Sequence, residues 1–234
     1  MEICAIVLPM HLYPVFLSLA DSRVLVAGAG KVGRRKIAGL RDARAGEILV
    51  FDPALSETDQ RELQALSGVR VLCRAVRDDD IAGCALVFAA TSDRAENERI
   101  AAACAAQGVL CNVADDPDGG TFHVPAHTRL NGLLAAFSTS GGSPALAGRI
   151  RKDAAVWLEE RYGPLLVFMG RLRPLVLAMD GEADQHGELF RSLVNSELGD
   201  FLARQDRLKI RETVTALLPA SLHGHIEELL HGLW

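Results

Sequence analysis

The chain has 234 residues and a mass of 25.2 kDa, which suits one full domain with a smaller one attached. Hydrophobic residues make up 49% and charged residues 24%, with a mean hydropathy of +0.16, so extensive disorder and a multi-span membrane protein are both excluded. The net charge of −5 gives no general attraction for nucleic acid or anionic lipid. An anionic ligand must therefore be met by a local basic cluster or by oriented backbone amides.

The cysteines and the first residues bear on the cellular compartment. The five cysteines are odd in number and form no CxxC pair, which indicates neither a disulfide framework nor a zinc site and favours a cytoplasmic protein. The apolar stretch over residues 3–20 lacks a basic leading segment and is interrupted by Pro9, His11 and Pro14. We therefore interpret it as mature protein rather than a signal peptide, with Met10 as an alternative start.

Residues 23–113 alternate short β-branched runs with longer helical patterns, which is typical of βαβ units on a parallel sheet. Asp93 and Glu96 resemble a capping box at the start of one helix, and Gly108 stands where a left-handed C-cap belongs. The expected strands cover residues 24–27, 48–51, 69–72, 86–90 and 109–113, and the expected helices cover residues 31–40, 57–65 and 95–107.

A different and smaller module is expected after residue 113. The polar turn over residues 115–120 is followed by two β-like runs at 121–124 and 132–138, and the apolar spacing beyond Pro144 is helical. The two runs make a sheet too small to cover itself, which favours pairing with a second copy of the chain. Breaks in the helical region are expected at Gly163, Pro174, Gly181 and Pro219.

These patterns predict an α/β protein in three parts. We expect a Rossmann-like NAD-binding domain with a parallel sheet over residues 1–114 and a small α+β dimerisation and active-site domain over residues 115–150. A helical C-terminal domain is expected over residues 151–234.

Residues 24–33 read VLVAGAGKVG and place a GxGxxG motif between an expected strand and an expected helix. Gly28 permits the tight turn, Gly30 lets a pyrophosphate approach the backbone, and Gly33 allows the helix to pack closely on the strand. The free amides and the positive end of the helix dipole would face the phosphates. The alternative is a glycine-rich turn in an α/β domain that binds no nucleotide.

The choice between NAD and NADP depends on Asp52, which ends the second expected strand roughly 20 residues after Gly30. A carboxylate there can bind the adenosine ribose hydroxyls and would repel a 2′-phosphate, so NAD is favoured. Arg34 and Arg35 weaken this preference, because either could reach such a phosphate, although residues within the first helix usually point elsewhere.

Four further segments carry a resemblance to a known family. They are LYPVFL at residues 12–17, AATSD at 89–93, NVADDP at 112–117 and STSGGSPALA at 138–147. Together with the glycine motif and the Arg-Arg-Lys that follows it, this ordered set resembles the siroheme synthase family, in its precorrin-2 dehydrogenase and sirohydrochlorin ferrochelatase module. The resemblance covers roughly residues 12–152, and its specificity comes from the combination, because a GxGxxG motif alone is weak.

The resemblance implies oxidation of precorrin-2 by NAD to sirohydrochlorin, followed in bifunctional members by insertion of ferrous iron to give siroheme. The chain is too short for the family's fused methyltransferase domain, so we expect the stand-alone form, which in the family is a homodimer. Whether iron insertion is physiological here stays open. The cofactor is expected to contact Gly28, Gly30, Lys31, Val32, Gly33, Asp52 and Thr91.

Removing two hydrogens from a reduced tetrapyrrole as hydride and proton needs a nicotinamide acceptor and a base, and iron insertion needs loss of two pyrrole protons. Asp115 lies just past an expected parallel strand, where open α/β sheets place their ligands, and it matches the family's catalytic aspartate. Spacing from Asn112 favours Asp115 over Asp116 as this residue. The alternative is that the two acids only start a turn before Pro117.

The substrate is a polycarboxylate, so a protein with a net negative charge needs a local region of positive potential to bind it. Ser143 as N-cap and Pro144 at the first helical position define a helix start with exposed amides, and Arg149 follows within the helix. The resemblance places Ser140 in the active site, and whether this serine is modified stays open. The expected substrate-binding residues are Ser140, Gly141, Gly142, Ser143, Arg149 and His123. An ordinary capped helix with a solvated basic face is the alternative.

The histidines are harder to assign. His123 departs from the family pattern, which commonly has an aliphatic residue there, and it is either a second base or transient iron ligand, or a tolerated polar group. His223, His225 and His231 near the C-terminus match no closed metal site that we recognise, and no resident metal is expected. Solvent-facing helix ends are the favoured explanation of these three histidines.

Two other functions remain open at this point. One is an NAD-dependent dehydrogenase of another small acid, although the short module after residue 113 offers little for its catalytic domain. The other is a nucleotide-sensing regulatory domain, in which the serine- and glycine-rich segment at residues 138–144 would have no role. Tetrapyrrole oxidation uses all of the segments, and we expect no nucleic-acid or membrane partner.

Overall fold

The computed structural model describes residues 11–179 and 183–234, so Met10 and Gly181 lie outside the described residues. The chain divides into two compact units, with described residues 11–124 in one and 125–234 in the other. We call them the N-terminal unit and the C-terminal unit. None of the helices in the described residues combines the length and the apolar character that a membrane crossing requires.

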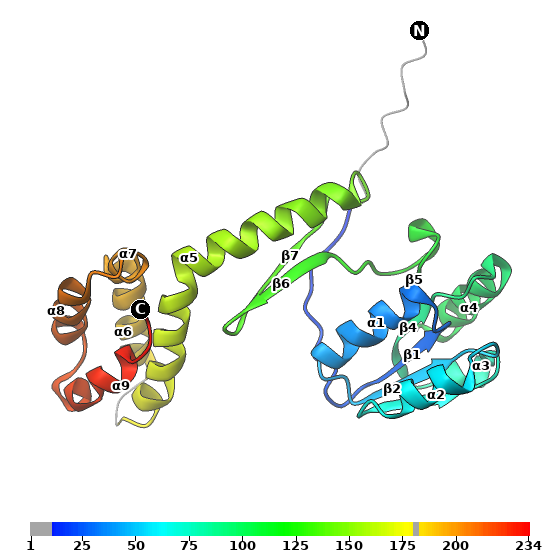
Figure 1. Ribbon diagram of the computed structural model, residues 1–234, viewed down its shortest axis with the longest axis horizontal. Coiled ribbons are helices and arrows are strands. Elements are labelled where there is room, and N and C mark those ends of the chain that lie inside the picture. The colour runs from blue at the N-terminus through cyan, green and yellow to red at the C-terminus, as the bar shows by residue number, and fades with distance from the viewer. Residues whose placement is uncertain (1–10, 180–182) are drawn as a thin grey trace, which may run out of the picture. The chain divides into compact units, whose positions relative to one another are not determined.

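The N-terminal unit is built on a five-stranded sheet with strand order β3-β2-β1-β4-β5, in which every neighbouring pair is parallel (Figure 1). Residues 24–27 of the central strand are all buried, as expected for a parallel sheet covered on both faces. The expected sheet is confirmed, with strand ends shifted by one or two residues. The strands are β1 (Arg23–Ala27), β2 (Glu47–Phe51), β3 (Val69–Leu72), β4 (Cys84–Ala89) and β5 (Leu110–Val113).

Helices cover both faces of this sheet. One face packs against α1 (Lys31–Asp42) and α2 (Glu57–Gln64), and the other packs against α3 (Asp78–Ile81) and α4 (Arg94–Gln107). The short helix α3 was not expected, because four residues are too few to show a helical period. The two faces form separate apolar cores that share the strands between them.

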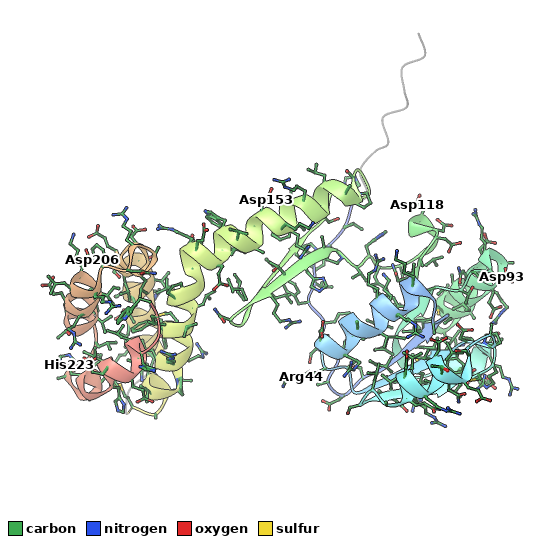
Figure 2. The ribbon with its side chains drawn as sticks, in the orientation of Figure 1. Arg44, Asp93, Asp118, Asp153, Asp206 and His223 are labelled. Atoms are coloured by element: carbon green, nitrogen blue, oxygen red, sulfur yellow. The ribbon has the colours of Figure 1, made fainter. Side chains whose placement is uncertain are left out.

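The ends of α4 follow the expected capping. Asp93, labelled in Figure 2 at the start of α4, accepts hydrogen bonds from the amides of Ala95 at 2.9 Å and Glu96 at 3.4 Å. Gly108 ends the helix in the left-handed conformation with φ +68°. The N-cap at Asp93 and the C-cap at Gly108 are confirmed, but the Glu96 carboxylate pairs with Arg99 and does not complete a capping box.

The N-terminal unit extends to Val124, beyond the boundary expected at residue 114. After β5 a short 3₁₀ turn leads to Thr121, whose amide donates to the Cys111 carbonyl at 2.7 Å. The Phe122 ring then packs edge-on against Phe88 of β4, with ring centroids 5.3 Å apart. The expected strand at residues 121–124 is wrong, because these residues bind back onto β5 and β4 instead of starting a hairpin.

The C-terminal unit begins with an antiparallel hairpin of β6 (Ala126–Leu130) and β7 (Leu133–Phe137). Asn131 and Gly132 connect the strands with φ of +44° and +89°, the signs that a two-residue hairpin turn requires. The expected run at 132–138 corresponds to β7, while β6 was missed. The hairpin packs against the first part of α5 (Pro144–Leu177), as Figure 1 shows.

Helix α5 continues through 34 residues, so the breaks expected at Gly163 and Pro174 are wrong, and it crosses the domain boundary expected at residue 150 without interruption. Each internal proline costs about 3 kcal/mol. Burial of a large apolar side chain stabilises by about 1.5–3 kcal/mol, and four such side chains follow Pro164, so packing outweighs the two prolines. The helix changes direction along its length (Figure 1), as proline-containing helices do. The buried side chains are those of Leu165, Phe168, Leu172 and Val176.

The second half of α5 forms one apolar core with the helices that follow it. Pro219 follows Leu218, the C-cap of α8, and precedes the next helix, so this expected break is confirmed. Asp206 caps α8, and both Asp206 and His223 are labelled in this helical region in Figure 2. The elements are α6 (Ala183–Asn195), α7 (Leu198–Arg204), α8 (Arg207–Leu217), the 3₁₀ helix η2 (Ala220–His225) and α9 (Ile226–Leu230).

Candidate active site

The glycine turn joins β1 to α1 and is shaped by two close backbone approaches. Gly28 has φ +89°, and a Cβ atom added there would lie 2.4 Å from the Ala90 carbonyl oxygen. A Cβ at Gly33 would lie 1.9 Å from the Gly28 carbonyl oxygen. A Cβ at Gly30, in contrast, would meet nothing within 4 Å. The turn is therefore closed where it packs on the protein and open at its middle glycine.

Among the described residues, no side chain caps the amides in the first turn of α1. Gly30 is the N-cap and has no side chain to accept from them, and the first turn contains no acidic residue. Lys31 and Val32 are exposed there. A helix start of this kind carries partial positive charge and is suited to a phosphate group.

Asp52 stands at the end of β2 and braces the turn. Its Oδ2 atom accepts from the Ala29 amide at 2.8 Å, and its Oδ1 atom accepts from the Ala54 amide at 2.9 Å. A carboxylate has further lone pairs for hydroxyl donors, so ribose binding stays a prediction. The carboxylate also holds the loop that carries Gly30.

The two arginines of α1 differ in their surroundings. Arg34 donates to the Ala29 carbonyl at 3.2 Å and forms ion pairs with Asp59 and Glu62 of the α2 helix, while Arg35 is exposed. The guanidinium of Arg34 is thus already engaged by groups of the N-terminal unit. This weakens the argument that Arg34 would bind the 2′-phosphate of NADP.

A buried hydrogen-bond network joins the ends of β4 and β5. Asn97 of α4 is 0% exposed. Its Oδ1 atom accepts from the Thr91 amide at 3.0 Å and from the Thr91 hydroxyl at 2.8 Å. Its Nδ2 group donates to the Thr91 carbonyl at 3.2 Å and to Asp115 Oδ1 at 2.9 Å. Because the Cβ position of Gly28 is 2.9 Å from Thr91 Cα, a chain of contacts runs from the glycine turn to Asp115.

Asp115 and Asp116 have different partners. Asp116 Oδ1 and the Asp116 carbonyl both accept from the Gly119 amide at 3.2 Å, so Asp116 starts the turn that follows β5. Asp115 is exposed and is held by Asn97. The guanidinium of Arg94 has its pKa raised, chiefly by its hydrogen bond to Glu98 and then by the charges of Glu98, Asp116 and Asp115.

Sequence reasoning missed Asn97. The buried positions of α4 are residues 97, 100 and 104, which share one helical face, and an asparagine among them departs from the apolar pattern. A polar residue at an apolar-period position is the signal that could have found it, because a buried amide requires hydrogen-bond partners.

The remaining predicted residues are placed as follows. His123 is half-buried and lies next to Phe122 in the N-terminal unit. Ser140 and Gly141 have φ of +49° and +87° in the C-terminal unit, and Ser143 caps α5 by accepting from the Leu146 amide at 3.2 Å. Arg149 is ion-paired at 2.8 Å with Asp153 of the same helix, which Figure 2 labels. The substrate-binding roles stay predictions.

The C-terminal histidines are engaged locally. His223 contacts the Leu218 carbonyl at 3.0 Å, and His225 lies 3.5 Å from Glu228. Within residues 11–179 and 183–234, no group of three or more histidine, cysteine, aspartate and glutamate residues is arranged to hold a metal ion.

The strand order reverses between β1 and β4, which places a topological switch point where the glycine turn meets Thr91. Open α/β sheets bind ligands outside the carboxyl ends of their strands at such a point. The fold and the glycine turn therefore define a dinucleotide-binding protein of the Rossmann class.

Comparison with known proteins agrees with this class. Residues 15–126 match a family described as "Putative NAD(P)-binding". The chain is 32% identical to a siroheme synthase of Enterobacter sp. (strain 638) over 94% of its own length and 48% of that protein. It is 34% identical to a siroheme synthase of Pseudomonas fluorescens (strain Pf0-1) over 82% of its length and 41% of that protein. Among solved structures, "SirC, precorrin-2 dehydrogenase" is similar with a TM-score of 0.70 and 27% identity, covering 88% of this chain and 98% of that one.

Siroheme synthases are thus homologues of this chain over most of its length. The chain spans about half the length of the curated relatives that it matches.

Proposed function

We propose that the protein oxidises precorrin-2 to sirohydrochlorin with NAD as the hydride acceptor, a step of siroheme biosynthesis. The observation that carries the proposal is the chain of contacts from the glycine turn through Thr91 and Asn97 to Asp115. It puts a nucleotide-type turn and a carboxylate at one edge of one sheet. The similarity to siroheme synthases and to a precorrin-2 dehydrogenase supplies the substrate class.

The residues present fit a dinucleotide. Open space at Gly30 and the uncapped first turn of α1 suit a pyrophosphate, and Asp52 stands beside the turn as a ribose ligand. Bound NAD would supply the hydride acceptor. The negative charge of Asp52 favours NAD over NADP.

Asp115 would accept the proton that is released when a hydride leaves the substrate. Asn97 binds Oδ1, and within the described part of the chain Oδ2 accepts no hydrogen bond, so Oδ2 is the oxygen available for proton transfer. The exposure of Asp115 leaves room for a large substrate. The same carboxylate could receive pyrrole protons if ferrous iron is inserted as a second substrate. The relatives are named siroheme synthases, and this name favours such an iron insertion.

We further propose that the protein is a homodimer in the cytoplasm. The two-stranded hairpin is small, and Leu146, Val156 and Trp157 of α5 are 52%, 58% and 55% exposed, so apolar surface of the C-terminal unit is available to a second copy. Light scattering at micromolar concentration should give about twice the 25.2 kDa chain mass. The thiols of Cys73, Cys84, Cys104 and Cys111 are free, in agreement with a reducing compartment.

The test is to mix the purified protein with precorrin-2 and NAD and to follow the visible spectrum. Formation of the sirohydrochlorin spectrum with one NADH for each product molecule is expected. NAD binding without turnover would favour a nucleotide sensor, and oxidation of a small hydroxy acid in place of the tetrapyrrole would favour the other dehydrogenase. Either result would reject the proposal.

A further inference from the structure

Asn97 has no exposed surface, and each polar atom of its side-chain amide is hydrogen-bonded. Three of the four bonds tie the start of α4 to the Thr91 segment that follows β4. The fourth bond, from Nδ2, leaves this segment and reaches Asp115 Oδ1 at 2.9 Å.

The orientation of the amide is fixed by its partners. Oδ1 receives two donors from Thr91, so a flipped amide would place its NH₂ group against the Thr91 N–H at 3.0 Å. One N–H of the correctly oriented amide therefore always points at Asp115.

The bond to Asp115 is not explained by a need to satisfy a buried carboxylate. Asp115 is exposed, and water can solvate its oxygens. A donor from a fully buried side chain nevertheless holds one of them. What this bond adds is a fixed position of the carboxylate relative to Thr91, and through Thr91 relative to Gly28 of the glycine turn.

We propose that Asn97 is a positioning residue, which holds the Asp115 carboxylate in place for proton transfer and leaves Oδ2 free. This inference rests on the proposed function, in which Asp115 is the base. Asn97 itself touches neither substrate nor cofactor, because it has no exposed surface.

The test variant is Asn97→Asp, which has nearly the same shape. It keeps an oxygen for the two Thr91 donors and replaces the Nδ2 donor, which serves both the Thr91 carbonyl and Asp115, with a second carboxyl oxygen. Two carboxyl groups in contact share a proton, so the carboxyl group of Asp115 should titrate at a pH higher than in the wild type by about one unit or more. Arg94 and Asp116 are the other charged groups near Asp115, and both are unchanged in the variant.

The readouts are the carboxyl ¹³C shift of Asp115 as a function of pH, assigned with Asp115→Asn, and steady-state kinetics. The kcat for precorrin-2 oxidation should fall about 10- to 100-fold, as expected for a misplaced reacting group, while the Kd for NAD stays within about twofold of the wild-type value. A purely structural role would lower the melting temperature without lowering the kcat of the folded protein.

Gln107→Glu is the matched control, because it makes the same amide-to-acid change on α4 at a side chain that donates to the Asp78 carbonyl at 2.9 Å. It should leave both the Asp115 titration and kcat unchanged. If Asn97→Asp does not fold, Asn97→Ser also removes the donor to Asp115, and a smaller upward shift is expected because the hydrogen bond is lost without a second carboxyl group.

An Asp115 titration that is the same in wild type and variant would overturn the positioning role. Wild-type protein that forms no NADH from precorrin-2 would instead reject the proposed function, while the titration would still decide the role of Asn97.

Discussion

Gly30 and Gly33 lie three residues apart in the same turn, but alanine at the two positions should have opposite consequences. A Cβ at Gly33 would lie 1.9 Å from the Gly28 carbonyl oxygen, whereas a Cβ at Gly30 would meet nothing within 4 Å. Gly30 also has φ −67° and ψ −172°, a conformation open to any residue. Gly33→Ala should therefore damage the fold, and Gly30→Ala should damage only the ligand site.

The magnitudes follow from this geometry. The clash at Gly33 is with backbone that cannot rotate away, so the free energy of unfolding should fall by about 3 kcal/mol, the upper end of typical overpacking costs. Gly30→Ala should change it by less than about 1 kcal/mol, since only the cap preference differs. If the added methyl displaces a phosphate from one charge-assisted hydrogen bond, about 1.5–3 kcal/mol is lost, which weakens NAD binding about 10- to 150-fold.

Urea unfolding and isothermal calorimetry with NAD measure the two effects separately. Gly30→Ala should show a normal unfolding midpoint and a raised Kd, and Gly33→Ala a lowered midpoint. Unchanged NAD affinity in a folded Gly30→Ala protein would refute phosphate binding at this turn.

Three other predictions concern single side chains. Wild-type protein should bind NAD more tightly than NADP. Asp52→Asn keeps an acceptor for the Ala29 amide but removes the charge, so the preference for NAD, expressed as the ratio of the two Kd values, should fall by about tenfold. Equal affinities for NAD and NADP in the wild type, measured by calorimetry, would contradict this. Burial, and to a smaller degree the charge of Arg35, lowers the pKa of Lys36 from 10.5 to about 8, so the folded state bears a desolvated ammonium below this pH. Lys36→Met should raise the free energy of unfolding by about 1–2 kcal/mol near neutral pH, after allowing for solvent screening. This gain should shrink between about pH 8 and 10.5, where Lys36 of the wild type is deprotonated in the folded state but still protonated in the unfolded state. A gain in chemical unfolding that does not depend on pH would exclude the buried ammonium as its cause. Asp93→Ala removes two cap hydrogen bonds and should cost about 1 kcal/mol of stability in the same assay, with no change at all arguing against the cap.

The parallel sheet could be predicted because its strands are buried on both faces and read as continuous apolar runs, such as residues 24–27. The caps at Asp93 and Gly108 were also predictable, since a capping side chain and a left-handed glycine act within a few residues of sequence. These features depend on local chemistry, which a sequence displays directly.

Features that depend on distant packing were not predictable in the same way. Helix α5 passes Gly163 and Pro174 because residues from α6 to α9 bury its apolar face, and the local pattern shows only the breakers. Residues 121–124 look like a strand but bind back to Cys111 and Phe88. Tertiary contacts decided both cases.

The candidate site also contains features that local sequence predicts and features that depend on distant contacts. The glycine turn and Asp52 follow from the motif and its spacing, while the link between α4 and Asp115 joins residues 18 positions apart through a buried amide. Only the departure of Asn97 from the apolar face of its helix hinted at this link.

The central claim is that the Asp115 carboxylate is the base of an oxidation carried out beside the glycine turn. The most direct measurement is the single-turnover rate of NADH formation from precorrin-2 at saturating NAD, in wild type, Asp115→Ala and the neighbouring control Asp116→Ala. A positioned general base contributes about 10²- to 10⁴-fold, so Asp115→Ala should be slower by at least about 10²-fold, with NAD affinity unchanged. Asp116→Ala, whose carboxylate only caps the turn at Gly119, should stay near the wild-type rate. An Asp115→Ala protein that forms NADH at the wild-type rate would contradict the claim, and proton loss directly to solvent would then be the better mechanism.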